Sequence, residues 1–234
     1  MQREIMQSRR CFLRHGAAAA GALALSGGAA LAAHAEKETG PLFIYATEDL
    51  MREHGVLRRI MLIYDAAAGR LETGQGLPGD ILPQTTDMVH RFVNEYHERL
   101  EEEHLFPRFR KAGKEVELVN VLLEQHEAGR RLTPMILAAA KEKNPPPPLR
   151  QQLARQLRQF NAMYAPHAAR EDTVLFPAFH SLVNEKEYAR ISDFFEDTEE
   201  VKFGDDAIEK FTAQLAEMEK ALGIHDLRQF TVNA

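Results

Sequence analysis

The sequence predicts an all-α protein, an up-down four-helix bundle followed by two additional C-terminal helices. Three observations predict this fold class: long stretches with apolar residues at helical spacing, very few strand signals, and a duplicated pair of helical segments. The chain has 234 residues, 44% of them hydrophobic and 27% charged, which is typical of a soluble globular protein. It is therefore long enough to bury a substantial core.

Composition excludes several classes of function. The chain carries 29 basic and 35 acidic residues, and this net charge of −6 argues against a nucleic-acid-binding protein, which would normally be basic. Its single cysteine, Cys11, excludes disulfide frameworks, iron–sulfur clusters, thiolate zinc sites and Cys-attached haem, because each of these needs several thiols or a dedicated motif. Ten histidines leave imidazole and oxygen ligands available for metal binding.

The first 35 residues have the features of a targeting segment. Residues 8–14 read Ser-Arg-Arg-Cys-Phe-Leu-Arg, an uncharged stretch rich in Ala, Gly and Leu follows at 16–33, and 33–35 form a small-x-small cleavage site. This pattern resembles the twin-arginine export signal. It implies cleavage after residue 35, a periplasmic location and the twin-arginine export machinery as a partner. The alternatives are a short membrane anchor or an Ala-rich cytosolic helix, but the stretch is too short and too weakly apolar for a retained membrane span.

The first half of the remaining chain predicts two helices. Apolar residues recur at helical spacing over about 47–65, and Thr47 is a plausible N-cap for this segment. A loop rich in glycine follows at 69–79. The second helix is expected over about 80–109, with Pro107 near its end.

The second half predicts four more helices. The third is expected over about 115–142 and is ended by the prolines at 145–148, which predict a stiff extended spacer. The others are expected over about 149–179, 184–202 and 206–222, with Gly223 as the C-cap of the last.

The predicted helices contain an internal repeat. In the second helix, His97, Glu101, Leu105, Phe106, Pro107 and Phe109 recur 70 positions later in the fourth as His167, Glu171, Leu175, Phe176, Pro177 and Phe179. In the first helix, Leu50, His54, Arg58 and Arg59 recur 72 positions later in the third as Leu122, His126, Arg130 and Arg131. The chain after the targeting segment therefore contains two copies of a helical hairpin, which precede the two C-terminal helices.

The repeated residues predict a metal site. A His and a Glu four positions apart lie on one face of a helix, so both can point at one interior site. A buried carboxylate is costly unless it is paired or binds a cation, and imidazole with carboxylate suits iron, manganese or zinc. The candidate ligands are His54, His97, Glu101, His126, His167 and Glu171.

The number of candidate ligands favours two metal ions. Six groups exceed the four that a single zinc usually accepts. If both carboxylates bridge, each metal has two nitrogens and two oxygens. An oxo or hydroxo bridge then leaves one open position per metal for O2, peroxide or nitric oxide. The alternative is that the His–Glu pairs are ordinary surface pairs, but the neighbouring Leu-Phe-Pro runs need a core.

The motif His-x-x-x-Glu-x-x-x-Leu-Phe-Pro, present twice with a lone His on each partner helix, resembles the hemerythrin-like (HHE cation-binding) family over about residues 45–180. The resemblance implies a hemerythrin-like four-helix domain at 36–182 with a C-terminal helical extension, 183–234, that packs on it. It also implies that the six candidate residues hold two iron ions, with manganese or zinc possible.

The sequence departs from the O2-carrying hemerythrins at one position. These proteins have a second His four residues after the third-helix His, where this chain has Arg130. The pattern is closer to six-ligand members linked to iron sensing, nitric-oxide response and iron–sulfur repair.

Other polar residues near the motif have simpler interpretations. His90 and His104 lie seven residues before and after His97 and are interpreted as rim histidines. Arg58 and Arg130 are expected to pair with glutamates such as Glu127. The sequence predicts a solvated position for Glu102, Glu103, His180 and His225, and core packing for Tyr96 and Tyr164, both near enough to the ligands to bond a bound oxygen species.

Three hypotheses for function follow. The first is a periplasmic non-haem di-iron protein that binds or reacts with O2, peroxide or nitric oxide. The alternative is an iron storage, delivery or sensing module without catalytic turnover, and the third is an interaction scaffold with a vestigial site. Enzymatic turnover is left open by the ligand set. The sequence shows no nucleophilic triad, phosphate-binding glycine loop or nicotinamide fingerprint.

Overall fold

The computed structural model describes residues 44–232, and the chain from Tyr45 onward forms one compact unit. All regular elements in this range are helical, which confirms the predicted all-α class. The first half contains α2 (Ala46–Glu72) and a continuous run of α3 (Ile81–Met88), η2 (Val89–His97), α4 (Glu98–Leu100), η3 (Glu101–Leu105) and α5 (Phe106–Ala112). The second half contains α6 (Val116–Ala140), the run α7 (Pro147–Arg170), η4 (Glu171–Leu175) and α8 (Phe176–Phe179), then α9 (Glu185–Phe203), α10 (Ala207–Leu222) and the short 3-10 helix η5 (Leu227–Phe230).

The targeting segment predicted over residues 1–35, with Cys11, lies outside the described residues. Among the helices between residues 44 and 232, none combines the length and the apolar character that a membrane span needs.

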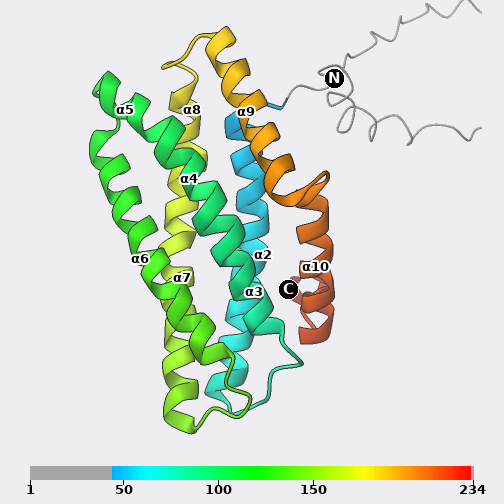
Figure 1. Cartoon of the computed structure of the whole chain (residues 1–234). Helices are drawn as coiled ribbons and strands as arrows, with labels where there is room; N and C mark the ends of the chain where they lie inside the picture. The colour runs from blue at the N-terminus through cyan, green and yellow to red at the C-terminus, as the bar shows by residue number, and fades with distance from the viewer. Residues whose placement is uncertain (1–43, 233–234) are drawn as a thin grey trace, which may run out of the picture. The chain divides into compact units, whose positions relative to one another are not determined.

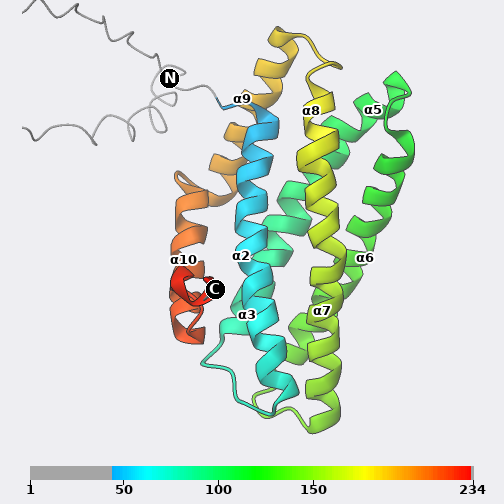
Figure 2. The same cartoon turned by 180° about the vertical axis from the view of Figure 1, so that it is seen from behind.

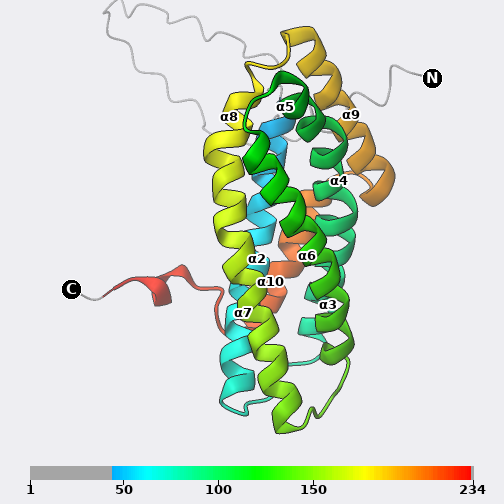
Figure 3. The same cartoon turned by 90° about the vertical axis from the view of Figure 1, so that its left-hand side faces the viewer.

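The four long helical runs, α2, α3 to α5, α6 and α7 to α8, lie alongside one another, and each runs in the direction opposite to the one before it (Figures 1 and 2). Helix α10 continues in the same direction as α9. α2 packs against α7, and α6 packs against α7 and α3. Figure 3 shows α6 and α7 side by side. Helices α9 and α10 both pack on α2. The two copies of the helical hairpin therefore face each other along their length, so residues at equivalent positions of the repeat can meet inside.

Two helix boundaries differ from the prediction. α2 continues to Glu72 rather than ending near residue 65, because Ala67, Ala68 and Leu71 are buried at helical spacing. The prolines at 145–148 are not all an extended spacer, since α7 begins at Pro147. Proline is tolerated in the first turn of a helix, where the N–H that it lacks would have no intrahelical partner.

The start of α2 also differs from the prediction. Tyr45, and not Thr47, is the N-cap, and its N–H donates to the Glu48 carboxylate at 3.0 Å. The hydroxyl of Thr47 is buried and hydrogen-bonds the hydroxyl of Tyr188 on α9. A residue that looks like a helix cap in the sequence thus joins two helices in the fold.

Wider π-helical turns occur at the same place in both copies of the repeat. η3 begins at Glu101 and η4 begins at Glu171. In each turn a backbone N–H donates to the glutamate carbonyl five residues back, from Phe106 in one copy and from Phe176 in the other. A proline follows each phenylalanine, and because proline cannot donate the usual bond to the residue four back, it favours the wider turn. The two glutamates therefore begin equivalent widened turns.

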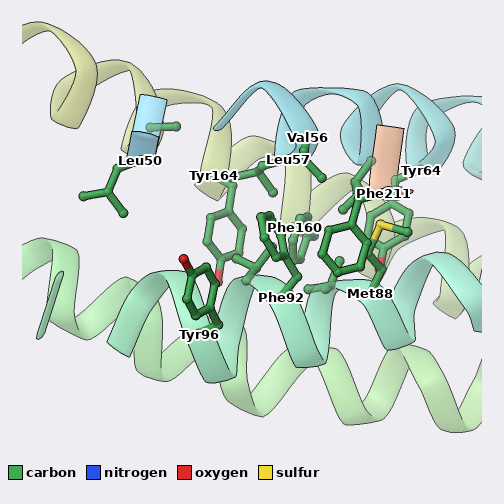
Figure 4. Packing of buried hydrophobic residues seen from close by; sticks show 14 of the residues in the cluster. Leu50, Val56, Leu57, Tyr64, Met88, Phe92, Tyr96, Phe160, Tyr164 and Phe211 are labelled. Carbon is green, nitrogen blue, oxygen red and sulfur yellow. The ribbon is translucent and has the colours of Figure 1, made fainter. Parts of the chain in front are cut away.

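Aromatic side chains fill much of the core between the helices. Figure 4 shows Phe92, Tyr96 and Phe211 together, and the ring centroids of Phe92 and Phe211 are 4.6 Å apart. Tyr164 packs against Phe160 with a centroid distance of 4.3 Å. Phe211 comes from α10, so this C-terminal helix contributes to the same hydrophobic core as the repeat.

A partly buried ion pair joins α10 to α2. The Arg59 guanidinium donates two hydrogen bonds of 2.7 Å to the two carboxylate oxygens of Glu219, which is 6% exposed. Burial by itself would raise the pKa of the Glu219 carboxyl, but hydrogen bonds from Arg59 and His225 outweigh it and hold this pKa below its ordinary value. The carboxylate is therefore stabilised in its ionised form.

Replacing Glu219 with Gln is expected to lower the free energy of unfolding at neutral pH by about 1–3 kcal/mol, because two charge-assisted hydrogen bonds are lost. A depressed folded pKa contributes stability above the unfolded pKa of about 4.3, and that stability is lost as the pH falls through the folded pKa. The difference from the wild type should therefore shrink below about pH 4. Urea unfolding of both proteins at neutral pH and at about pH 3 measures this difference in the free energy of unfolding.

Arg158→Ala, which removes an exposed ion pair with Glu72, is the control, and it should lower the free energy of unfolding by less than about 1 kcal/mol. A difference that stays constant with pH would contradict the expectation.

Candidate metal centre

The fold brings the six predicted ligands together in its interior. His54 comes from α2, His126 from α6 and His167 from α7, while His97 ends η2. The two glutamates begin the widened turns η3 and η4. The exposed fractions of the six residues are 0% for Glu101, Glu171 and His126, 1% for His54, 3% for His167 and 4% for His97. Each of the four long helical runs therefore contributes at least one side chain to one buried cluster.

The four imidazoles form two matching pairs. The Nε2 atoms of His54 and His97 are 3.1 Å apart, and so are the Nε2 atoms of His126 and His167. A phenylalanine from the repeated Leu-Phe-Pro run stacks on one ring of each pair. Phe176 stacks on His54 with a centroid distance of 5.5 Å, and Phe106 stacks on His126 at 5.6 Å. The repeat thus places the same pair of rings, with the same apolar cover, twice.

Each glutamate contacts one histidine of each pair. Glu101 Oε1 lies 3.7 Å from His97 Nε2, and Glu101 Oε2 lies 3.4 Å from His126 Nε2. Glu171 Oε2 lies 3.4 Å from His54 Nε2 and 3.1 Å from His167 Nε2. The carboxylates therefore stand between the two imidazole pairs, which is the position that a shared ligand of two neighbouring cations would occupy.

The oxygen atoms of these glutamates are fully buried, and the groups closest to them are the imidazoles. All four carboxylate oxygens of Glu101 and Glu171 lack a hydrogen-bond partner among residues 44–232. Burying a carboxylate in this way is strongly unfavourable unless a cation binds it. These residues form two buried groups, and within each group the ligand atoms lie within 4.8 Å of one another. One group is Glu101, His126, His167 and Glu171, and the other is His54, His97 and Glu101. These buried His and Glu residues fit a metal site.

The protonation of the imidazoles supports the same conclusion. Each Nδ1 faces an acceptor oxygen: His54 faces Asp172 at 2.7 Å, His97 faces Glu53 at 2.6 Å, His126 faces Glu102 at 3.0 Å, and His167 faces Gln125 Oε1 at 2.9 Å. Because an ionised carboxylate or an amide carbonyl can only accept, Nδ1 carries the proton in each neutral ring. When both rings of a pair are neutral, the lone pairs of their Nε2 atoms face each other. A proton on one ring, or a cation between the two, would replace this repulsion with a favourable contact.

The pKa values of the centre reflect both burial and the charges beside each group. Burial raises the pKa of the Glu101 carboxyl, and the charge of Glu171 beside it raises it further. Burial also lowers the pKa of His97, and the neighbouring His54 ring adds to this. Burial acts to lower the pKa of His54 and His126 too, but the nearby carboxylates outweigh it and raise both. The carboxylates thus stabilise a positive charge at the centre, whether a proton or a metal ion carries it.

Sequence reasoning missed the acceptors behind the histidines. It interpreted Glu102 as solvated, whereas this carboxylate accepts from His126 and Arg130, and these contacts outweigh burial and lower its pKa to about 2. Arg58 binds Asp172, and Arg131 rather than Arg130 lies near Glu127. The repeat itself carried the signal, because Asp172 lies 70 positions after Glu102.

The other predicted residues lie away from the two imidazole pairs or serve other contacts. The Tyr164 hydroxyl donates to Glu98 at 2.6 Å, and the Arg130 guanidinium donates to the same carboxylate at 2.9 Å. Tyr96 is buried against Phe203. His104 packs against Phe194 of α9, and the exposed residues include His90, Glu103, His180 and His225.

Comparison with known proteins identifies relatives of the chain. The model of the hemerythrin HHE cation-binding domain matches residues 45–178 and, in a second overlapping match, residues 118–229. Over 230 residues the chain is 39% identical to an uncharacterized protein of Mycobacterium tuberculosis strain H37Rv, and the alignment covers 95% of this chain and 90% of that protein. An uncharacterized protein of Mycobacterium bovis shows the same identity and coverage. No solved structure matches the chain.

Proposed function

This chain belongs to the hemerythrin HHE cation-binding family, and on that premise we propose that it binds two iron ions at the centre formed by its buried histidines and glutamates. The observation that carries the proposal is that four histidine Nε2 atoms and the buried carboxylates of two glutamates form two overlapping groups of ligand atoms within residues 44–232. The proposed cofactor has an oxo or hydroxo bridge, and manganese or zinc would also suit these ligands.

The arrangement suggests how the residues would hold the two ions. His54 and His97 would bind one ion, and His126 and His167 would bind the other. Glu101 and Glu171, which each contact both pairs, would be shared. When bound, iron supplies redox chemistry and open coordination positions for a small ligand such as O2, peroxide or nitric oxide. The chain itself orients the rings through their Nδ1 partners and keeps bulk water out with the stacked phenylalanines.

We interpret the architecture as an up-down four-helix bundle with two appended helices. The interpretation rests on the four long helical runs that carry the six residues and on the packing of α9 and α10 against α2. The proposed bounds, expected from the sequence, are 36–182 for the principal domain and 183–234 for the extension.

The alternative function is iron storage, delivery or sensing without turnover. Arg130 favours it over simple O2 carriage, because this residue stands where O2-carrying hemerythrins have a further His and its guanidinium binds Glu98 and Glu102 instead. Transfer of iron from the loaded protein to an apo-acceptor, with no consumption of added peroxide, would support the alternative. Rapid loss of peroxide or nitric oxide without loss of iron would support a reactive centre.

The proposed site of action is the periplasm, with the twin-arginine machinery as the export partner. The support is the sequence pattern of residues 8–35. Replacing Arg9 and Arg10 with Lys in the full-length chain should retain it in the cytoplasm, and fractionation measures this. Continued appearance in the periplasm would contradict the proposal.

Metal analysis tests the proposed function directly. We expect about two iron ions per chain in the wild type, and at most one in His97→Ala, because one imidazole pair is broken. His90→Ala is the matched control, since His90 is exposed and should leave the metal content unchanged. Elemental analysis, together with optical spectroscopy in air, measures the iron content of the wild type and of the two variants. Unchanged iron in His97→Ala, or fewer than two metals in the wild type after reconstitution, would contradict the di-iron proposal.

A further inference from the structure

The two copies of the repeat differ in the group that supports one histidine of each imidazole pair. Glu53 precedes His54 in the first copy, and Gln125 stands at the equivalent position 72 residues later. The Nδ1 of His97 faces the Glu53 carboxylate at 2.6 Å, whereas the Nδ1 of His167 faces the Gln125 amide oxygen at 2.9 Å. A buried carboxylate in one copy thus takes the place of a neutral amide in the other.

The supports of the other two histidines match between the copies. His54 donates to Asp172, which also binds Arg58, and the equivalent His126 donates to Glu102, which also binds Arg130. Each of these histidines therefore has one carboxylate backed by one arginine. These supports are alike in kind, although one acceptor is an aspartate and the other a glutamate.

One further buried carboxyl, Glu98, lies near His126. Its oxygens accept hydrogen bonds from Asn94, Tyr164 and Arg130. It therefore supports the tyrosine and the arginine and does not accept from an Nδ1 atom. The charge of Glu98 also acts on His126, but without a hydrogen bond to the ring. Among the contacts shown for residues 44–232, the Glu53–Gln125 difference is the one made through a hydrogen bond to an imidazole.

A carboxylate that accepts from Nδ1 makes the imidazole a stronger donor at Nε2 than a neutral amide does, because it stabilises the positive charge that coordination places on the ring. Inside a protein this effect is not screened by water, and Glu53 is 1% exposed. Removing a partner of this kind typically changes metal affinity by about 10–100-fold.

We propose that the two metal positions have unequal affinities: the His54–His97 pair holds a tightly retained ion and the His126–His167 pair holds an exchangeable one, and the Glu53–Gln125 difference sets the order. This inference rests on the proposed function, since it requires that two ions bind. It assigns positioning roles to Glu53 and Gln125. One ion would thus be a resident part of the fold, and the other would be available for exchange.

The test is an anaerobic titration of the metal-free full-length chain with ferrous iron, followed by release of iron to a chelator. The wild type should bind two ions in steps about 10–100-fold apart and release them at two rates. Glu53→Gln should lower the affinity of the tight step, and Gln125→Glu should raise the affinity of the weak step. Each substitution should therefore bring the two dissociation constants closer together. The double swap should restore two separate steps. His54→Ala should abolish the tight step, whereas His126→Ala should abolish the weak one.

The swaps separate this cause from repulsion between two bound ions. Repulsion would also produce two steps, but neither Glu53→Gln nor Gln125→Glu would change their spacing, and that result would overturn the proposal. Two equal steps in the wild type would overturn it while leaving the di-iron proposal intact. A wild type that binds fewer than two ferrous ions would overturn both. Far-ultraviolet circular dichroism of each metal-free variant shows that it is folded, and Gln125→Glu provides the result if Glu53→Gln does not fold.

Discussion

Removal of the metal is expected to lower the melting temperature of the protein by roughly 8–16 °C for each tightly held ion. An ion present at about 1,000 times its dissociation constant stabilises the folded state by about 4 kcal/mol, and 1 kcal/mol corresponds to about 2–4 °C for a domain of this size. The physical reason lies in Glu101 and Glu171, whose buried oxygens have no hydrogen-bond partner in the described part of the chain. Without a cation, their burial opposes folding.

Calorimetry of the reconstituted protein, before and after chelation and dialysis, measures this effect. Glu101→Gln is a useful companion, because it removes one charge from the centre and one shared ligand. Its metal-free form should be as stable as the metal-free wild type or more stable, while its gain on adding iron should be smaller. Identical melting curves for the loaded and metal-free wild type, with metal content verified by elemental analysis, would refute the expectation.

Replacing Gly129 with Ala is expected to destabilise the protein by about 2–4 kcal/mol. A Cβ atom at this position of α6 would lie 1.9 Å from the Tyr164 hydroxyl oxygen and 2.9 Å from its ring carbon Cζ. Tyr164 is 1% exposed, so it has little room to move, and its displacement would take a hydrogen bond from the buried Glu98. Overpacking and a lost hydrogen bond to a charged group each cost about 1–3 kcal/mol.

Gly55→Ala is the matched control for this substitution. Gly55 also lies inside a long helix, α2, and within residues 44–232 no atom beyond its chain neighbours and the adjoining helix backbone comes within 4 Å of a Cβ built there. Alanine should therefore stabilise the protein at this position by about 0.5–1 kcal/mol, through helix propensity alone. Chemical denaturation of both variants gives the two free energies. If both substitutions changed the free energy of unfolding by a similar amount and in the same direction, the contact with Tyr164 would not be the cause of the effect of Gly129→Ala.

Combining Gly129→Ala with Tyr164→Phe tests the cause of the loss. The phenylalanine lacks the hydroxyl that would meet the new methyl group, so part of the cost should disappear and the two substitutions should couple favourably. Strict additivity would mean that the loss arises elsewhere in α6.

The general course of the helices could be predicted from the sequence, because apolar residues at helical spacing and glycine at helix ends act locally. Gly223 follows the last long helix with a φ of 76°, as its sequence position indicated. The boundaries were harder, since they depend on partners distant in the chain. Thr47 is drawn into a hydrogen bond with Tyr188, and α2 extends to Glu72 because its last residues are buried by other helices.

The cluster of six candidate residues could also be anticipated, because the repeat pairs equal residues at constant offsets and a helix puts a His and a Glu four apart on one face. The acceptors behind the imidazoles could not be identified from the local sequence, although the offset of 70 between Glu102 and Asp172 carried a signal for two of them. Glu102 sits in a run of three glutamates in which nothing local distinguishes the one that turns inward to His126 from Glu103, which is exposed.

The sequence by itself determined the helical class, the duplicated hairpin and the six side chains able to form a metal centre, because each follows from spacing along one helix or between two copies of it. Only the tertiary structure decided which acceptor supports each histidine, and thereby that Glu53 and Gln125 make the two halves unequal. The physical reason is that a hydrogen bond across helices depends on their packing and rotation, which arise from the whole core at once.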